Sequence, residues 1–210
     1  MKSPSAKKEP IVKGATGYSE VVKRFVQVTE EIPFNTLHQD FLRFFPNEKS
    51  LILDAGAGTG RDAYTFSLEG HSVLAVEPLA EFRAAGKERY ASDRITWMDD
   101  SLPELKKLGD YTGNIDFILC SGVWHHLNET EQKQGLTRIS ELLKTGGVFA
   151  LSLRNGPAGA GTHVFPVRLR HILEWAHACA FEPLMILEHQ PSLMEGKEEV
   201  TWARLVLKKT

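Results

Sequence analysis

Cysteine is scarce in this 210-residue sequence, which contains two cysteines and no CxxC pair. This spacing argues against a cysteine-based metal site and against a disulfide framework. Cys120 and Cys179 both lie in apolar surroundings, so we interpret them as buried free thiols. We expect no metal site.

Long apolar runs and a strong net charge are missing too. No run approaches the roughly 20 residues of a transmembrane helix, and the first twenty residues lack the apolar stretch of a signal peptide. The formal net charge is −2, and the lysine-rich residues 1–13 leave the remainder more negative still. A negative domain is poorly suited to follow nucleic-acid phosphates. We therefore expect a cytoplasmic protein with neither a nucleic-acid nor a membrane partner, and the oligomeric state stays open.

The N-terminal part of the chain changes in character at residue 18. Residues 1–17 are rich in lysine, serine, proline and glycine, a composition that predicts a flexible tail. Two helices are expected after it, over residues 19–32 and 36–45, because each has an apolar face and ends before a proline. They would form a helical cap, residues 18–48, on a single domain that covers residues 18–210.

From residue 51 onward, predicted strands and helices alternate. Strands are expected at residues 51–54, 72–76, 95–98, 115–120, 148–153, 184–188 and 201–207, and helices at 60–69, 79–90, 130–144 and 168–180. Repeated strand–helix units predict an α/β fold, with a mainly parallel sheet and helices on both faces. Only a loop joins the last two strands, so the final pair should be antiparallel.

The most specific motif is a glycine-rich turn after the first predicted strand. Three alternating glycines, Gly56, Gly58 and Gly60, separate that strand from a helix, and Asp54 precedes them. Glycine lets the backbone approach a ligand closely because it has no Cβ. The helix beyond offers free N–H groups to an anion, whereas the Asp54 carboxylate suits a cationic amine.

Two other nucleotide-binding patterns fit this turn less well. The dinucleotide fingerprint G-x-G-x-x-G requires glycine at the position of Arg61. The negative charge of Asp54 would also be out of place beside a pyrophosphate. The phosphate-binding loop of nucleotide triphosphatases requires Gly-Lys followed by serine or threonine, which the turn lacks.

The D-x-G-x-G-x-G pattern that starts at Asp54 resembles the class I S-adenosylmethionine (SAM)-dependent methyltransferase family. Glu77 ends the second predicted strand, 21 residues after Gly56, near the spacing at which an acid reaches a ribose. The resemblance implies a Rossmann-like seven-stranded sheet, SAM as cofactor and S-adenosylhomocysteine (SAH) as product. It also implies that Glu77 binds the ribose and that Asp54 neighbours the methionine amino group. Arg61 would either approach the methionine carboxylate or pair with Asp62.

Asp99 and Asp100 follow the third predicted strand. In the family, an acid at this place accepts a hydrogen bond from the adenine amino group. The interval before Leu102-Pro103 is one residue shorter than usual, so both aspartates are candidates and we favour Asp99. Either could instead be a solvated residue that caps the next helix.

Residues 116–127 resemble the family's fourth motif, where cofactor and acceptor meet. The motif contains Cys120, a cofactor-binding candidate, and His125 and His126. Their His-His-Leu ending resembles members that act on small molecules, and the Asn/Asp-Pro-Pro-aromatic motif of nucleobase methyltransferases is absent. One imidazole could take a proton from the acceptor, or both could merely pack at the loop. Trp124 could stack on adenine or on the acceptor.

The loop after the fifth predicted strand, residues 154–163, contains three glycines and would line the acceptor side of the cleft. Arg154 could bind an acidic acceptor there, but we favour a solvated charge at the strand end. The sequence thus predicts a SAM-dependent methyltransferase with a small-molecule acceptor. The alternatives are a transferase that uses another group of a SAM-like cofactor and a non-catalytic SAM- or SAH-binding module.

Overall fold

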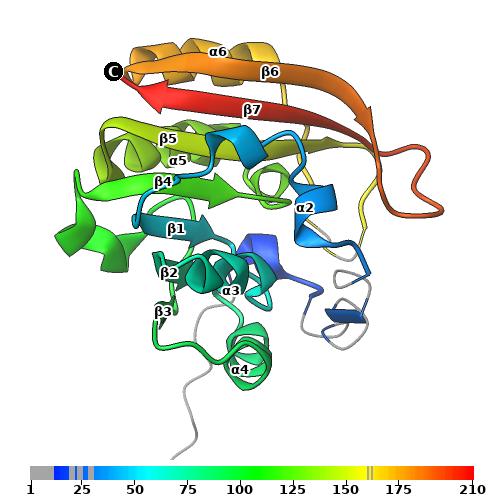
Figure 1. Ribbon diagram of the computed structural model, residues 1–210. Coiled ribbons are helices and arrows are strands. Elements are labelled where there is room, and N and C mark those ends of the chain that lie inside the picture. The colour runs from blue at the N-terminus through cyan, green and yellow to red at the C-terminus, as the bar shows by residue number, and fades with distance from the viewer. Residues whose placement is uncertain (1–11, 19–21, 23–25, 28–30, 160, 162) are drawn as a thin grey trace, which may run out of the picture.

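A seven-stranded sheet runs through the molecule in the order β3-β2-β1-β4-β5-β7-β6 (Figure 1). The computed structural model describes residues 12–18, 22, 26–27, 31–159, 161 and 163–210. The strands are β1 Leu51–Ala55, β2 Ser72–Val76, β3 Ile95–Met98, β4 Ile115–Cys120, β5 Leu143–Asn155, β6 Phe181–Pro191 and β7 Thr201–Lys209. Pairs among β1 to β5 are parallel, and β7 lies antiparallel to both β5 and β6. The predicted sheet and its antiparallel end are confirmed.

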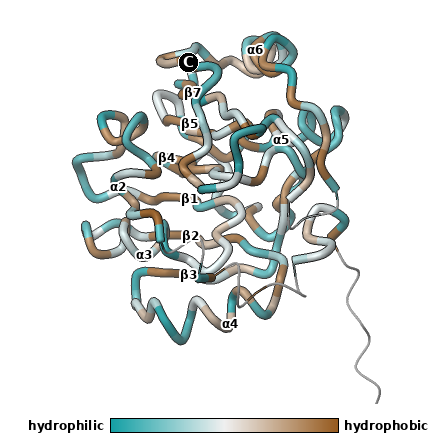
Figure 2. Tube along the Cα trace, turned by 90° about the vertical axis from the view of Figure 1, so that its right-hand side faces the viewer, coloured by the Kyte–Doolittle hydropathy of each residue, from teal (hydrophilic) through white to brown (hydrophobic). Residues whose placement is uncertain are grey.

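Helices cover both faces of the sheet and build two hydrophobic cores. The main helices are α3 Arg61–Leu68, α4 Ala80–Arg89, α5 Glu129–Leu142 and α6 Leu169–Ala178. On one face α5 and α6 bury Leu136, Ile139 and Ile172, and on the other α3 buries Phe66 beside Phe41. Hydrophobic segments accordingly follow the strands inside the molecule (Figure 2). Among the described residues, no helix is long and apolar enough to span a membrane.

The order of the strands reverses between β1 and β4. From β1 the chain moves outward through β2 and β3, then returns to place β4 on the other side of β1. In open α/β sheets, ligands bind beyond the carboxyl ends of the strands at such a switch point. The fold therefore brings the ends of β1, β2, β3 and β4 to one edge, together with the turns that follow them.

The N-terminal cap differs from the prediction. The predicted helix over residues 36–45 is wrong: α2 covers only Phe34–Leu37, and a 3-10 helix covers Leu42–Phe44. Aromatic packing positions this segment instead of a continuous helix, since Phe41 is fully buried and Phe45 packs on Phe66. Most of the predicted helix over residues 19–32 lies outside the described residues.

Part of the predicted tail is ordered against the domain. Lys13–Ala15 form a 3-10 helix, and a Cβ added to Gly14 would lie 3.0 Å from Cβ of His126. Gly14 and Tyr18 of this segment thus contact His126, near the end of the fourth motif. The tail predicted for residues 1–17 thus includes a short turn that contacts the domain, and residues 1–11 lie outside the described part.

Candidate functional site

The glycine turn leaves open space beside one of its three glycines. The φ angles of Gly56, Gly58 and Gly60 are 87°, 55° and 84°. A Cβ added to Gly56 would lie 2.3 Å from Cγ2 of Val123, and one added to Gly60 would lie 2.6 Å from the ring of Trp97. A Cβ at Gly58 would meet no heavy atom of the described residues within 4 Å. Packing thus accounts for Gly56 and Gly60, whereas Gly58 borders space that a ligand could occupy.

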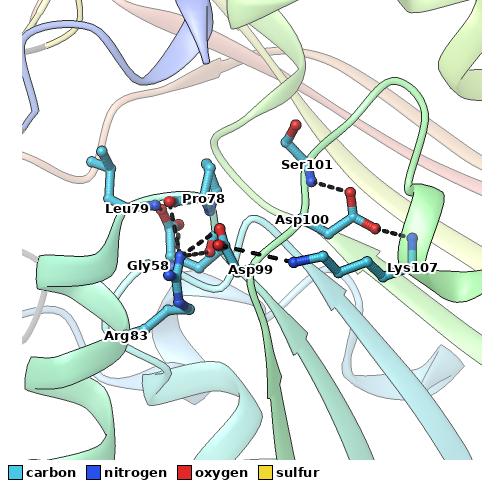
Figure 3. A network of polar contacts seen from close by, with 9 residues as sticks. Gly58, Pro78, Leu79, Arg83, Asp99, Asp100, Ser101 and Lys107 are labelled. Atoms are coloured by element: carbon cyan, nitrogen blue, oxygen red, sulfur yellow. Dashed lines mark hydrogen bonds and ion pairs between the residues drawn. The ribbon is translucent and has the colours of Figure 1, made fainter. Parts of the chain in front are cut away.

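Glu77 joins the end of β2 to this turn. Its Oε2 accepts a hydrogen bond from the backbone N–H of Gly58 at 3.0 Å, and its Oε1 accepts one from Leu79 at 2.8 Å. Burial raises the pKa of Glu77 to about 7, although the two amides and the charge of Arg83 favour the ionised form. The carboxyl group therefore lies between Gly58 and Leu79, two residues that Figure 3 labels, and its pKa lies near neutrality.

Asp99 is linked to the same network through Arg83. Its Oδ1 lies 3.0 Å from Nη1 of Arg83, and its side chain is 34% exposed. The same nitrogen donates to the backbone carbonyls of Glu77 and Pro78. Arg83 therefore fixes the end of β2 and holds Asp99 beside it, with the Asp99 carboxylate still accessible (Figure 3).

Asp100 points into its own loop instead. Its two carboxylate oxygens accept hydrogen bonds from the backbone N–H groups of Ser101 at 2.8 Å and Lys107 at 2.7 Å. These bonds close the turn after β3. Asp100 thus resembles the capping residue that the sequence allowed as an alternative to a cofactor contact. Of the two candidates, Asp99 has the geometry that suits a ligand contact, and Asp100 has the geometry of a structural residue.

Asp54, at the end of β1, has an unsatisfied oxygen. The residue is 3% exposed, and the backbone N–H of Ala63 donates to its carboxyl group. Its Oδ2 has no hydrogen-bond partner among the described residues. Burial raises the pKa of Asp54 well above its usual range, and the nearby charge of Asp62 raises it further. A buried acceptor without a donor is costly, and a cationic amine would satisfy it.

Arg61 and Asp62, in the first turn of α3, connect this helix to the N-terminal cap. Arg61 Nε lies 2.8 Å from Oδ1 of Asp62, and its Nη1 donates to the backbone carbonyl of Ile32 at 3.2 Å. His38 Nε2 lies 2.8 Å from Oδ2 of Asp62. Burial opposes ionisation of Asp62, but the contacts with His38 and Arg61 hold its pKa below its usual range. Of the two predicted alternatives for Arg61, the structure has the pairing with Asp62.

Cys120 and Trp124 are fully buried in the core that α5 covers. Burial raises the pKa of Cys120 far above its usual range. Cys120 could therefore contact a cofactor only through its backbone. The ring of Trp124 packs on Phe149, with centroids 5.8 Å apart. The expectation that Trp124 stacks on adenine or acceptor is wrong, because the hydrophobic core encloses its ring.

His126 lies between a backbone carbonyl and a tyrosine hydroxyl. Its Nδ1 is 2.6 Å from the carbonyl oxygen of His163, and its Nε2 is 3.0 Å from the hydroxyl of Tyr18. A carbonyl can only accept, so Nδ1 carries the proton and the lone pair of Nε2 accepts from Tyr18. Burial lowers the pKa of His126, which favours the neutral imidazole. In this neutral tautomer, Nε2 is the nitrogen of His126 that can accept a proton.

His125 is more enclosed. It is 4% exposed, and its Nδ1 has no hydrogen-bond partner among the described residues. Burial lowers its pKa to about 2, with smaller effects from His126 and Arg154. The ring of Trp202 meets the His125 ring edge-on, with centroids 6.2 Å apart. His125 thus resembles the packing histidine that the sequence allowed as an alternative.

Tyr18 and Trp202 belong to this edge, although no sequence motif marks them. The Tyr18 ring lies edge-on to His126 and to Phe82, with centroids 5.4 Å and 6.3 Å apart. Trp202, on β7, is the cross-strand partner of Arg154 on β5. Tyr18 and Trp202 therefore contact the two histidines of the fourth motif, although they come from opposite ends of the chain.

Arg154 is only 9% exposed, so the expectation of a solvated charge is wrong. Its Nη1 and Nη2 donate to the backbone carbonyls of Gly156 at 3.3 Å and Pro157 at 2.7 Å. Burial lowers the pKa of Arg154. In the part of the chain that the structure describes, no group of three or more His, Cys, Asp or Glu side chains could hold a metal ion.

A switch-point sheet, a glycine turn and acids after β2 and β3 define a nucleoside-binding α/β domain. Residues 52–147 match a family model described as a methyltransferase domain. An uncharacterized methyltransferase of Bacillus cytotoxicus is 29% identical over 135 residues, which are 63% of this chain and 56% of that protein. One of Bacillus thuringiensis is 31% identical over 101 residues, 47% of this chain and 45% of that protein. The chain spans about half the length of these curated relatives.

Solved methyltransferase structures share the fold. The 1,6-didemethyltoxoflavin-N1-methyltransferase of Burkholderia thailandensis, crystallised with 1,6-didemethyltoxoflavin and SAH, superposes with a TM-score of 0.62 at 21% identity. That match covers all of this chain and 98% of the other. Phosphoethanolamine N-methyltransferase 2 of Haemonchus contortus, solved with SAM, gives a TM-score of 0.73 at 16% identity, over all of this chain and 62% of the other. Residues 52–147 thus match the methyltransferase-domain family model, and the whole chain shares the fold of these solved methyltransferases.

Proposed function

We propose that this protein binds SAM and transfers its methyl group to a small-molecule acceptor. The observation that carries the proposal is the open space beside Gly58, whose backbone N–H already donates to the carboxyl group of Glu77. A carboxyl group at the end of β2 suits the two hydroxyls of a ribose. The glycine turn and Glu77 together fit the nucleoside half of SAM.

The remaining acids fit the other parts of the same cofactor. The accessible carboxylate of Asp99 suits the adenine amino group, and Asp100 stays the weaker candidate because backbone amides occupy it. The unpartnered Oδ2 of Asp54 suits the methionine amino group. Arg61 is the weakest of these candidates, because it already contacts Asp62 and Ile32.

Bound SAM supplies a methyl group on a positively charged sulfur, so transfer needs mainly proximity and orientation. A base is required only where the acceptor atom starts protonated. We assign that role to His126, because its Nε2 lone pair faces Tyr18 rather than the core. The acceptor would give its proton to the Tyr18 hydroxyl, which would pass its own to Nε2, as the methyl carbon bonds to the acceptor, its bond to the sulfur breaks and SAH is left. His125 would support the loop, since its low pKa and burial keep it neutral.

Isothermal titration tests the cofactor assignment. We expect the purified protein to bind SAM and SAH with micromolar dissociation constants and NAD not at all. The structural reason is that the Asp54 carboxyl group and the glycine spacing disfavour a pyrophosphate. Binding of NAD in place of SAM, or of neither ligand, would leave only the α/β fold standing.

We expect His126→Asn to lower kcat by about 100-fold, the lower end of what a general base contributes, while the dissociation constant for SAM stays unchanged. The assay follows SAH release during a screen of small amines, thiols and hydroxyl compounds and is then repeated with the acceptor found. His177→Asn is the matched control, because His177 is an exposed residue of α6. Full activity of His126→Asn would exclude the base role.

A non-catalytic SAM- or SAH-binding module is the second candidate. The observation that favours it is the contact of residues 12–18 with His126, where a Cβ on Gly14 would come within 3.0 Å. A cleft covered by the chain's own N-terminal residues would bind a cofactor without admitting an acceptor. SAM binding with no SAH release across the whole screen would favour this candidate.

A further inference from the structure

Arg154 is a buried cation without a carboxylate partner. It lies near the end of β5 and is 9% exposed, and no carboxylate of the described residues lies within 4 Å of its guanidinium nitrogens. Arg204, the other arginine below 10% exposure among the described residues, has Asp40 at 3.9 Å and the rings of Phe41 and Trp202 beside it. A buried charge is costly unless it is paired, so the missing anion at Arg154 needs an explanation.

The two hydrogen bonds of Arg154 do not provide one. The guanidinium donates to the carbonyls of Gly156 and Pro157, which fixes the loop after β5. A guanidinium has five N–H groups, so three remain for another partner. A neutral amide could hold the same carbonyls without placing a positive charge in a buried position. The loop contacts therefore explain why hydrogen-bond donors are present at position 154, but not why the side chain is positively charged.

The surroundings of Arg154 place it on the acceptor side of the site. Its charge acts on Tyr18, His125 and His126, whose pKa values it lowers in each case as a smaller effect beside burial. Trp202 faces it across the β5–β7 pair. The cofactor contacts at Glu77 and Asp99 are instead grouped around Arg83. Arg154 is thus the buried cation next to the proposed base and is separate from the cofactor network.

We propose that Arg154 binds an anionic group of the methyl acceptor, a carboxylate or a phosphate, and so selects acidic acceptors. This inference rests on the proposed function. A planar guanidinium matches either oxyanion with two parallel hydrogen bonds. Held there, the anion would lie beside His126 and Tyr18, with the methyl-accepting atom directed toward the cofactor. The anion would also supply the counter-charge that the buried arginine lacks.

Inorganic phosphate and acetate serve as probes, each titrated into SAH-saturated protein. The indole N–H signal of Trp202, assigned with Trp202→Phe, reports on the surroundings of Arg154, its cross-strand partner. We expect a saturable shift with at least one of the two anions, and which anion binds tighter distinguishes a phosphate from a carboxylate acceptor. Arg154→Gln should weaken binding at least fivefold, and Arg154→Lys should retain most of it because the charge remains.

Arg170→Gln is the matched control, since Arg170 is exposed on α6 and pairs with Glu174. An equal shift in Arg154→Gln, or no saturable shift in the unmodified protein, would overturn the proposal. If Arg154→Gln fails to fold, the unmodified protein still tests the proposal, because the absence of a saturable shift there overturns it. Calorimetry separates the two proposals, because SAH binding without anion binding rejects only the role of Arg154. Where SAH does not bind, the proposed function fails, and the same titration on ligand-free protein still tests the anion site.

Discussion

Replacing Glu77 by alanine is expected to raise the dissociation constants for SAM and SAH at least tenfold, about 1.4 kcal/mol. The substitution removes the acceptor for the ribose hydroxyls and leaves the N–H groups of Gly58 and Leu79 without their partner. Isothermal titration measures the change. Glu81→Ala is the matched control, because Glu81 is an exposed acid in the first turn of α4. Unchanged affinity in Glu77→Ala would remove Glu77 from the cofactor site.

The titration of Glu77 is expected to change stability and cofactor affinity in opposite directions as the pH rises. Because its pKa is raised from 4.5 to about 7 in the folded protein, ionisation of Glu77 disfavours folding. The free energy of unfolding of the ligand-free protein should fall from about pH 4.5 to about pH 7 through this group. Cofactor affinity should instead rise as pH passes 7, since the carboxylate is the better acceptor. Glu77→Gln should flatten both trends.

Gly56→Ala is expected to lower the free energy of unfolding by about 2–4 kcal/mol. The residue has a positive φ angle, and the new Cβ would lie 2.3 Å from Val123. Chemical denaturation of the ligand-free protein measures this loss. The side chain of Val123 has no short way out of the contact, because three of its atoms would lie within 3.3 Å of the new Cβ.

Gly58→Ala is the matched comparison. Its Cβ would enter open space, so only the positive φ angle of 55° opposes it, and the expected loss of stability is about 1–2 kcal/mol. Cofactor affinity should nevertheless fall at least tenfold, because the methyl group would occupy the ligand's space. If Gly58→Ala left SAM binding intact, the cofactor would not lie against this turn.

The sequence predicts the sheet well because its signals are local. Each parallel strand is a short apolar run followed by a turn, and the capping box of α5, formed by Asn128 and Glu131, is also local. The second N-terminal helix failed because Phe41 and Phe45 are positioned by packing on α3 and β4, which no helix signal records. Local sequence patterns thus predict where the strands lie, whereas tertiary contacts determine the conformation of the N-terminal cap.

Within the site, two tryptophans show most clearly what the local sequence cannot predict. Trp124 stands in a recognisable motif, but its ring is buried in the core, whereas Trp202 stands in no motif and packs edge-on against His125. The position of Trp202 depends on the register between β5 and β7, which pairs it with Arg154. Tyr18 meets His126 across 108 residues of chain. Contacts this distant leave no mark in the local sequence.

The order of the strands in the chain and in the sheet leaves β6 without its partner for part of synthesis. β6 leaves the ribosome before β7, yet β7 is its only sheet neighbour among the described strands. Until β7 has been made, β6 has no partner, and Leu184 and Ile186 of this strand stay exposed even in the folded protein. An unpaired apolar edge invites association with other chains. The late arrival of β7 therefore makes the interval between these two strands the period in which the nascent chain most needs protection.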